Sequence, residues 1–411
     1  MYSLGIYIYS FLVRVAACLG NTKAKQLSSG QKNIWNQIGS ALHEGEQRIW
    51  IHAASVGEFE QARPLLEDIR EKFTQYKTVV TFFSPSGYEL RKNYPGADYI
   101  FYLPYDTGRN AKRFIREVKP SEVYFIKYEF WKNYLSVIRK NHIPLYLVSA
   151  NFRSGQSFFK WYGGWYRKQL KAFTRFFVQN KRSADLLAGI GYHNVTVTGD
   201  TRFDRVCRIV DNARELPEIK QFVNGAQCMV AGSTWPPDEN LLVRYINTGK
   251  HRMKWIIAPH ELHDSQIEAL MKSIAVPSIR YSRLTGDLSR YQVLVIDNIG
   301  MLSSLYRYGS IAYIGGGFGK GIHNTLEAAA YGIPVLFGPA YKKFQEAIDL
   351  VDQGGAFSIS GYDELESRMN DLFDHSGKLS EAGRIAGAFV SSGRGATQKV
   401  IQETLSGKNP E

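Results

Sequence analysis

The sequence predicts an α/β protein with two doubly wound domains in tandem and an apolar N-terminal helix. Its 411 residues suit two or three domains, at roughly 150 residues each. Short apolar runs rich in Val, Ile, Phe and Tyr alternate with helical patterns, which is typical of βαβ units and parallel sheets. The runs form two series, separated by a polar stretch near residues 205–225. Each series therefore predicts one parallel sheet.

The first predicted element is the apolar helix. Residues 1–19 carry a single charge, on Arg14. A helix would gather Ser3, Ser10 and Arg14 on one narrow stripe. Its length of about 28 Å is barely the thickness of a bilayer core, so residues 1–30 are expected to associate with a membrane, either spanning it or lying on it. A signal peptide and a buried core helix are the alternatives, although no basic residue precedes the apolar run.

The strands follow in two domains. In an N-terminal domain over residues 31–210, strands are predicted at 48–54, 78–83, 98–103, 122–127, 144–150, 175–179 and 195–199. In a C-terminal domain over 211–385, they are predicted at 228–233, 255–260, 293–297, 311–317 and 334–338. Residues 386–411 contain no further strand, so we expect a helical tail that packs back across the domain junction. Ligands of such domains bind at the carboxyl ends of the strands, where motifs are therefore sought.

Composition and charge exclude several classes of protein. The chain carries 51 Lys and Arg against 38 Asp and Glu, and this net charge of +13 favours phosphates or anionic lipid as partners. No recognised nucleic-acid motif accompanies the charge. The cysteines, Cys18, Cys207 and Cys228, are too far apart for a disulfide framework or a cysteine zinc site. His260 and His263 miss the spacing of the H-E-x-x-H zinc motif, so no metal is expected.

Two glutamates follow strands of the first domain. Ser55 and Glu58 have the spacing of a capping box, worth about 1 kcal/mol. Alternatively, Gly57 permits close approach of a ligand, and a helix N-terminus keeps the carboxylate of Glu58 ionised, as a general base requires. Glu129 follows the fourth strand and is expected at the same cleft, or else as a solvated helix start. The residues alone leave both pairs of alternatives open.

Glycine-rich and proline-rich turns follow strands of the second domain. After the strand at 311–317, a glycine loop leads into a helix, so that bare N–H groups would face an anion. The loop fits neither the P-loop nor the dinucleotide fingerprint, and a purely structural loop is the alternative. Glu327 either caps the helix with Asn324 or accepts a hydrogen bond from a ribose diol. Ser233 and Thr234, before two prolines, are a second candidate phosphate turn.

The cation–aromatic run over residues 160–168 is suited to lipid headgroups or to a partly buried amphipathic helix.

Taken together, the motifs resemble those of the Kdo (3-deoxy-D-manno-octulosonic acid) transferases, a family with the GT-B glycosyltransferase fold of two Rossmann-like domains. The resemblance spans nearly the whole chain. Besides the apolar N-terminus, it rests on HAASVGE at 52–58, Glu129-Phe-Trp131, Asn151-Phe-Arg153, Gly199-Asp-Thr-Arg202-Phe-Asp204, Ala258-Pro-His260, Gly315-Gly-Gly317 and Asn324-Thr-Leu-Glu327.

The resemblance implies that Kdo is transferred, with inversion, from CMP-Kdo to a lipid A precursor such as lipid IVA, at the cytoplasmic face of the inner membrane. Glu58 would be the base, and Glu129 and Arg202 would support the transition state. The chain departs from the family twice, because Lys127 stands where a glutamate is common and Arg202 where a lysine is common. Arginine keeps the charge but changes the geometry.

The resemblance also implies where the substrates bind. CMP would be held by Pro259, His260, Gly315, Gly316, Gly317, Asn324, Thr325, Leu326 and Glu327, to which the turn adds Ser233 and Thr234. Ser55, Gly57 and Arg153 are assigned to substrate binding in the first domain. No cofactor is expected beyond the donor CMP-Kdo. Two other classes stay open: a nucleotide-sugar epimerase or hydrolase of the same fold, and a nonenzymatic membrane-bound nucleotide-binding module.

Overall fold

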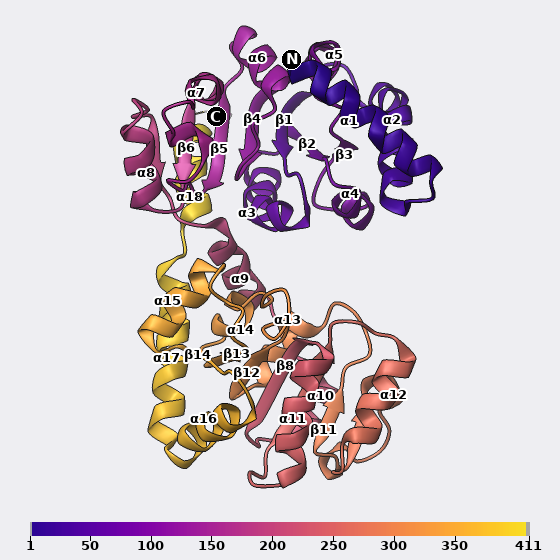
Figure 1. The fold of residues 1–411 in the computed structure, drawn as a ribbon, viewed down its shortest axis with the longest axis vertical. Helices are drawn as coiled ribbons and strands as arrows, with labels where there is room; N and C mark the ends of the chain where they lie inside the picture. Colours follow the sequence, from indigo (N-terminus) through magenta and orange to yellow (C-terminus); the bar gives the residue numbers. More distant parts are fainter. Residues whose placement is uncertain (1, 408–411) are drawn as a thin grey trace. The chain divides into compact units, whose positions relative to one another are not determined.

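A computed structural model describes residues 2–407 of the chain (Figure 1). Met1 and residues 408–411, which begin the predicted membrane segment and end the predicted tail, lie outside the described residues. The chain divides into two compact units, Met1–Arg205 with Gly395–Glu411 and Val206–Arg394. Each unit contains a seven-stranded sheet with helices packed on it. The predicted α/β class with two parallel sheets is confirmed.

Unit 1 has the strand order β3-β2-β1-β4-β5-β6-β7, and its strands pair in parallel. They are β1 (Gln47–His52), β2 (Tyr76–Phe82), β3 (Tyr99–Tyr102), β4 (Pro120–Ile126), β5 (Leu145–Ala150), β6 (Arg175–Val178) and β7 (Val195–Val197). The apolar runs fit this sheet, because strands buried on both faces need not alternate with polar residues. The strand order reverses between β1 and β4, so the ligand-binding position of such a sheet lies at the ends of these two strands.

The helices of unit 1 cover both faces of the sheet. They are α2 (Thr22–Ala41), α3 (Val56–Lys72), α4 (Pro85–Arg91), α5 (Gly108–Val118), α6 (Lys132–Lys140), α7 (Gly164–Leu170), α8 (Lys181–Ala188) and α18 (Ala396–Thr404), with a 3₁₀ turn at Ser157–Phe159. One core cluster joins the sheet to α2, α5 and α6, and another joins it to α3 and α18.

The C-terminal helix α18 belongs to unit 1. Val400 and Ile401 are buried in the core cluster that contains α3. The carboxylate of Asp204 accepts hydrogen bonds from the backbone N–H groups of Gly395 and Thr397 at 2.6 and 2.7 Å. The division between the units falls inside α9 (Thr201–Asp211), which continues into the polar stretch near residues 205–225.

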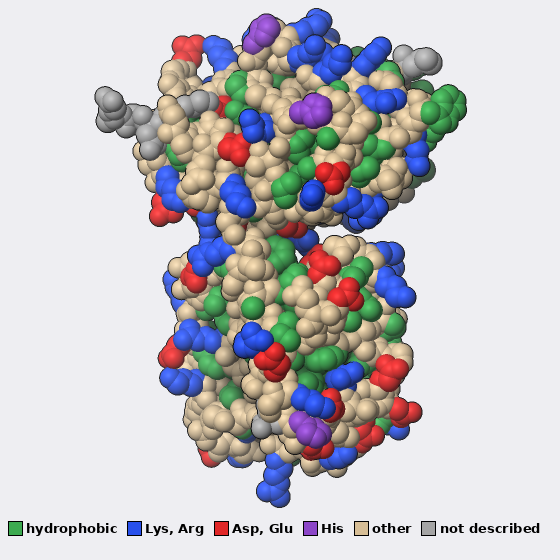
Figure 2. Space-filling view, turned by 90° about the vertical axis from the view of Figure 1, so that its left-hand side faces the viewer, with side chains coloured by type: hydrophobic (Ala, Val, Ile, Leu, Met, Phe, Trp, Pro, Cys, Tyr) green, Lys and Arg blue, Asp and Glu red, His purple; other side chains and the backbone are tan. Residues whose placement is uncertain are grey.

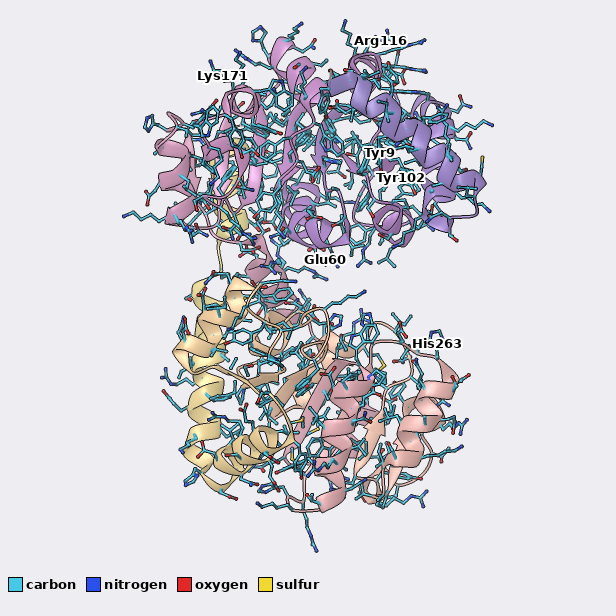
Figure 3. All side chains as sticks on the ribbon, viewed as in Figure 1. Tyr9, Glu60, Tyr102, Arg116, Lys171 and His263 are labelled. Atoms are coloured by element: carbon cyan, nitrogen blue, oxygen red, sulfur yellow. The ribbon has the colours of Figure 1, made fainter. Side chains whose placement is uncertain are left out.

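The apolar N-terminal segment forms helix α1 (Tyr2–Cys18) on unit 1. Tyr2 donates a hydrogen bond to Asp106 at 2.6 Å, and the ring of Tyr9, which is labelled in Figure 3, packs against Phe83 and Tyr105. Large apolar side chains of α1 stay exposed, namely Leu4, Tyr7, Ile8, Phe11, Leu12 and Val15. Among residues 2–407, none of the helices combines the length and the apolar composition needed to cross a bilayer.

Unit 2 has the strand order β10-β11-β9-β8-β12-β13-β14, again with parallel pairing. The strands are β8 (Cys228–Thr234), β9 (Lys254–Pro259), β10 (Ser278–Arg280), β11 (Val293–Val295), β12 (Ile311–Ile314), β13 (Val335–Phe337) and β14 (Ala356–Ser358). The two edge strands, β10 and β14, were not predicted, because each holds a single large apolar residue, whereas the equally short β11 and β13 are apolar throughout.

The helices of unit 2 surround this sheet. They are α10 (Pro217–Val223), α11 (Pro236–Thr248), α12 (Asp264–Ser273), α13 (Leu302–Leu305), α14 (Leu326–Ala329), α15 (Gln345–Gln353), α16 (Tyr362–Asp374) and α17 (Ser376–Ser392), with 3₁₀ turns at Tyr281–Arg283, Leu288–Arg290 and Tyr306–Tyr308. The order reverses between β8 and β12, so the predicted glycine loop follows a strand at the position where ligands bind in such sheets.

Candidate active site

Glu58 lies in the first turn of α3, directly beyond the central strand β1. The predicted capping box does not form, because the Ser55 side chain makes no hydrogen bond to a helix amide. Its hydroxyl instead donates to Oε2 of Glu58. A Cβ atom at Gly57 would meet only the Ser55 hydroxyl, at 3.8 Å, so the backbone here is open to a ligand. The capping alternative is wrong, and the half-buried carboxylate of Glu58 is held by one hydroxyl at a helix N-terminus.

Glu129 follows β4 and is held from behind by two ring nitrogens. Its Oε2 accepts a hydrogen bond from Nε1 of Trp131 at 2.6 Å and lies 3.3 Å from Nε2 of His52. His52 ends β1 and is completely buried. The side chain of Glu129 is only 14% exposed, so the alternative of a solvated helix start is wrong. The sequence reading missed His52, although it stands in the HAASVGE motif.

Arg202 is fixed by Asp200, which the sequence reading also missed. Nε and Nη2 of Arg202 both contact Oδ2 of Asp200, at 2.9 and 2.8 Å. Gln61 and Gln179 each donate to the same carboxylate at 2.9 Å. Burial alone would raise the pKa of Asp200, but the charge and hydrogen bonds of Arg202 lower it below its usual value. The guanidinium therefore rests on an ionised carboxylate that also accepts hydrogen bonds from two glutamines, and 27% of the arginine side chain stays exposed.

Tyr128 shows that residues far apart in the sequence meet at this end of unit 1. Burial raises its pKa, and the charges of Arg153, Asp200 and Glu58 act on it as well. Its hydroxyl donates to the carbonyl of Asn151 at 2.5 Å. These residues follow β1, β4, β5 and β7, so the structure gathers the predicted unit 1 residues at one edge of the sheet. Arg153 itself is exposed.

Lys127, where the chain departs from the family, adopts a left-handed backbone conformation with φ of 64° directly after β4. Such a conformation is costly for a residue with a side chain and is concentrated at functional sites.

Glu60 of α3, labelled in Figure 3, contacts three arginines, Arg63, Arg91 and Arg205, so its charge is neutralised within the protein. Glu58, by contrast, has no arginine or lysine contact among the ion pairs of the described residues.

In unit 2, the glycine loop packs backbone against backbone. A Cβ atom at Gly315 would lie 2.1 Å from the carbonyl oxygen of Ser233, and one at Gly317 would lie 2.4 Å from the amide nitrogen of Gly338. The amide of Gly315 donates to Gly232, and that of Gly316 to Asp238, both at 2.9 Å. The prediction that these two N–H groups are bare is therefore wrong, because the protein itself uses them.

The turn after β8 carries a second left-handed residue, Ser233, with φ of 53°. Thr234 donates to Glu239 at 2.9 Å, and burial raises the pKa of this glutamate. A cavity of about 150 Å³ lies beside them, lined by Thr234, Trp235, Pro236, Glu239, Pro259, Glu261, Gln266, Ile267 and Leu270. Two of the predicted nucleotide-binding residues, Thr234 and Pro259, thus share one hollow of unit 2.

Three rings stack in front of the glycine loop. The ring of His260 lies 4.6 Å from that of Trp235 and 4.5 Å from that of His323, nearly parallel to both. Nε1 of Trp235 donates to Nε2 of His323 at 3.2 Å, which requires that this nitrogen carries no proton. Burial, followed by the charge of His260, lowers the pKa of His323. His260 was predicted as a nucleotide contact, whereas Trp235 and His323 were not.

The segment from Asn324 to Glu327 opens the short helix α14. Asn324 accepts a hydrogen bond from the amide of Leu326 at 3.1 Å, and its side-chain NH₂ donates to Glu327 at 2.9 Å. Leu326 and Thr325 are 0% and 1% exposed, so both side chains are buried in unit 2. Within residues 2–407, no group of three or more His, Cys, Asp and Glu is placed to hold a metal ion.

The fold resembles that of solved enzymes from two groups, the nucleotide-sugar epimerases and the glycosyltransferases. The chain is similar to the structure of UDP-GlcNAc 2-epimerase from Neisseria meningitidis, with a TM-score of 0.63 and 15% identity over 87% of this chain and 99% of that one. It is also similar to MurG from Acinetobacter baumannii, with a TM-score of 0.52 and 14% identity over 87% and 98%. At these low identities, the likenesses show the fold alone.

The sequence comparisons point to the same family as the motifs. Residues 28–205 match the model described as 3-deoxy-D-manno-octulosonic-acid transferase (kdotransferase). The chain is 28% identical to the 3-deoxy-D-manno-octulosonic acid transferase of Rickettsia bellii over 82% of each chain. It is 26% identical to that of Aquifex aeolicus over 79% of this chain and 85% of the relative. Residues 28–205 thus match the Kdo transferase model, and over most of its length the chain is similar to Kdo transferases, the family that its motifs resemble.

Proposed function

We propose that this protein transfers Kdo from CMP-Kdo to a hydroxyl group of a lipid A precursor such as lipid IVA, in lipopolysaccharide biosynthesis. The observation that carries the proposal is the carboxylate of Glu58, which stands in the first turn of α3 without serving as a cap or pairing with a cation. A general base needs an ionised, accessible carboxylate, and a helix N-terminus favours the ionised form.

In this reaction Glu58 accepts the proton of the acceptor hydroxyl. The hydroxyl oxygen attacks the anomeric carbon of Kdo, the bond to the phosphate of CMP breaks, and CMP leaves with the bonding electrons. Attack from the face opposite the leaving group inverts the anomeric carbon. Arg202, fixed on Asp200, is suited to stabilise the negative charge of the donor, and Glu129 is suited to stabilise positive charge that develops on the sugar.

The donor nucleotide is assigned to unit 2. Its candidate contacts are the turn at Ser233 and Thr234, Pro259 and His260, and the carboxylate of Glu327, which Asn324 orients. Since the amides of Gly315 and Gly316 are occupied, these glycines serve the donor by close backbone approach and not by donating hydrogen bonds.

The acceptor and the location are assigned to unit 1. Helix α1 exposes a row of large apolar residues, and Trp161 of the nearby aromatic run is 91% exposed. The ring of Trp165 contacts Tyr2 of α1 at 6.0 Å, and Nζ of Lys132 lies over both rings. Figure 2 shows Lys and Arg side chains spread over the visible face of unit 1. Apolar and cationic groups together suit an anionic membrane surface, which we propose is the cytoplasmic face of the inner membrane.

Mass spectrometry of the lipid products tests the proposal. Purified protein is incubated with CMP-Kdo and a tetraacylated lipid A precursor, and the variant Glu58→Gln is run in parallel. We expect Kdo to be added to the lipid by the wild type and not by the variant. Consumption of the donor without a lipid product would favour a nucleotide-sugar epimerase or hydrolase, and binding of CMP without turnover would favour a nonenzymatic module.

A further inference from the structure

His52 is a fully buried, titratable side chain that no step of the proposed reaction uses. It ends β1, the strand that precedes Glu58, and it packs edge-on against Phe125 and Trp131 with ring centroids 5.3 and 6.2 Å away. Its polar contacts lie on opposite sides of the imidazole ring. Nδ1 faces Thr81, and Nε2 faces Trp131 and Glu129.

Each state of Nδ1 has one partner on Thr81, because a protonated Nδ1 can donate to the carbonyl oxygen and an unprotonated Nδ1 can accept from the hydroxyl. Nδ1 lies 3.1 Å from the carbonyl oxygen of Thr81, which can only accept, and 2.8 Å from the hydroxyl of Thr81, which can also donate. The same hydroxyl accepts a hydrogen bond from Nε1 of Trp50 at 2.8 Å. Thr81 therefore holds the imidazole ring in orientation without dictating where its proton lies.

The contacts at Nε2, by contrast, do determine where the proton lies. Nε2 of His52 and Oε2 of Glu129 are 3.3 Å apart, and the indole of Trp131 offers one N–H, at 2.6 Å from the carboxylate and 3.0 Å from the imidazole. One N–H cannot serve two acceptors well, and two lone pairs facing each other without water repel. The arrangement is favourable only if a second proton lies between His52 and Glu129.

We propose that His52 is a positioning residue, which donates from Nε2 to Oε2 of Glu129 and so holds this carboxylate in its working orientation. The inference rests on the proposed role of Glu129 in Kdo transfer. Two ring N–H groups, from His52 and Trp131, then converge on a single oxygen. The other oxygen, Oε1, accepts no hydrogen bond within residues 2–407 and is left for the substrate. Buried partners that orient a working group in this way commonly affect activity about 10–100-fold.

Two substitutions distinguish the contacts of Nε2 from those of Nδ1. In His52→Gln the side-chain amide reaches the position of Nε2 and can still donate to Glu129. In His52→Asn the shorter amide reaches only the position of Nδ1 and the contact with Thr81. We expect kcat for Kdo transfer to fall about 10–100-fold in His52→Asn, with KM for the lipid acceptor unchanged, and to recover to within a few-fold of the wild type in His52→Gln. The exposed His193→Gln is the matched control.

A structural role would lower kcat of both variants in proportion to their stability, which thermal unfolding measures. Equal losses of kcat in His52→Asn and His52→Gln would therefore overturn the proposal. If the wild type transfers no Kdo, the proposed function fails, and the position of the proton has to be read directly.

Nitrogen-15 NMR of histidine-labelled protein reads the proton without any turnover, with the signal assigned by its loss in His52→Gln. We expect Nε2 of His52 to be protonated at pH 7 in the wild type. In Glu129→Ala the N–H of Trp131 is released to donate to His52, so we expect Nε2 to become unprotonated. An unprotonated Nε2 in the wild type, or a signal that Glu129→Ala leaves unchanged, would overturn the proposal whether or not the protein transfers Kdo.

Discussion

The two units hold the residues at the ends of their strands by different means. In unit 1, Glu129 contacts the buried side chain of His52, and Arg202 donates hydrogen bonds to the buried carboxylate of Asp200. In unit 2, the glycine loop is fixed by close backbone contacts, and the rings before it are stacked. A network of side chains can orient charged groups toward a substrate, whereas backbone packing determines the shape of a binding surface. The reactive groups are therefore expected in unit 1, and unit 2 is expected to respond to substitution through its stability and its binding.

The largest effect is expected from Glu58→Gln, which keeps the shape of the side chain and removes its basicity. A positioned general base contributes about 10²–10⁴-fold, so turnover should fall by that factor, about 3–5 kcal/mol of barrier. Affinity for CMP, measured by calorimetry, should stay nearly unchanged because the nucleotide is assigned to unit 2. Wild-type-like turnover in this variant would break the contrast between the units.

Gly315→Ala should produce the opposite outcome, a loss of stability. Its Cβ atom would lie 2.1 Å from Ser233 O and 2.6 Å from Thr234 Cα, and backbone atoms cannot rotate away. We expect the free energy of unfolding to fall by about 3 kcal/mol, the upper end of the usual cost of overpacking. Urea denaturation measures this change.

The matched control for this glycine is Gly319→Ala in the same loop. Its Cβ atom would meet Gly316 O at 3.6 Å, which is ordinary contact. The control should therefore unfold like the wild type. Equal stabilities of Gly315→Ala and Gly319→Ala would show that the loop is not held by backbone packing.

The candidate sites of the two units also show how much of the structure could be predicted from the sequence. Local patterns predicted the long buried strands, the glycine loop and the positions of Glu58 and Glu129, because each depends on neighbours in the sequence. The spacing of Ser55 and Glu58 could not decide whether the hydroxyl bonds an amide or the carboxylate, since both lie within its reach. That choice depends on geometry and not on spacing.

Contacts between distant residues were beyond the sequence reading. Asp238 reaches Gly316 across 78 positions, and His52 contacts Trp131 across 79. A side chain that arrives from another helix or strand leaves no periodic signal, so the occupied amides and the buried partner of Glu129 were not foreseen. The edge strands β10 and β14 were missed for a different reason, because each holds a single large apolar residue and so shows no apolar run.

A smaller effect on chemistry is expected from Arg202→Lys. Two nitrogens of Arg202 contact Oδ2 of Asp200, and a single ammonium cannot make both contacts and also extend toward the donor. We expect kcat to fall about tenfold, or about 1.4 kcal/mol of barrier. Arg175→Lys, at a pair with Glu403 that is 43% exposed on the arginine side, should leave kcat unchanged. If Arg202→Lys also has no effect, the guanidinium geometry is unimportant, and the lysine common in the family would serve equally.

The smallest effect concerns the charge state of the ring stack in unit 2. Because the pKa of His323 is lowered from 6.5 by burial and by His260, the unfolded chain binds more protons than the folded one as the pH falls through 6.5. The free energy of unfolding must then decrease on acidification below pH 6.5, by the uptake of at most about one proton from this group. Protonation would also remove the acceptor that Nε1 of Trp235 uses.

His323→Gln should flatten this part of the stability curve, measured by urea denaturation between pH 5 and 8. His263→Gln is the control, because that side chain is 70% exposed and should titrate alike in the folded and unfolded chains. A His323→Gln curve parallel to that of the wild type would mean that the ring stack tolerates a positive charge. The nucleotide phosphate could then pair with a cationic histidine in unit 2, and the contrast between charged side chains in unit 1 and backbone packing in unit 2 would no longer hold.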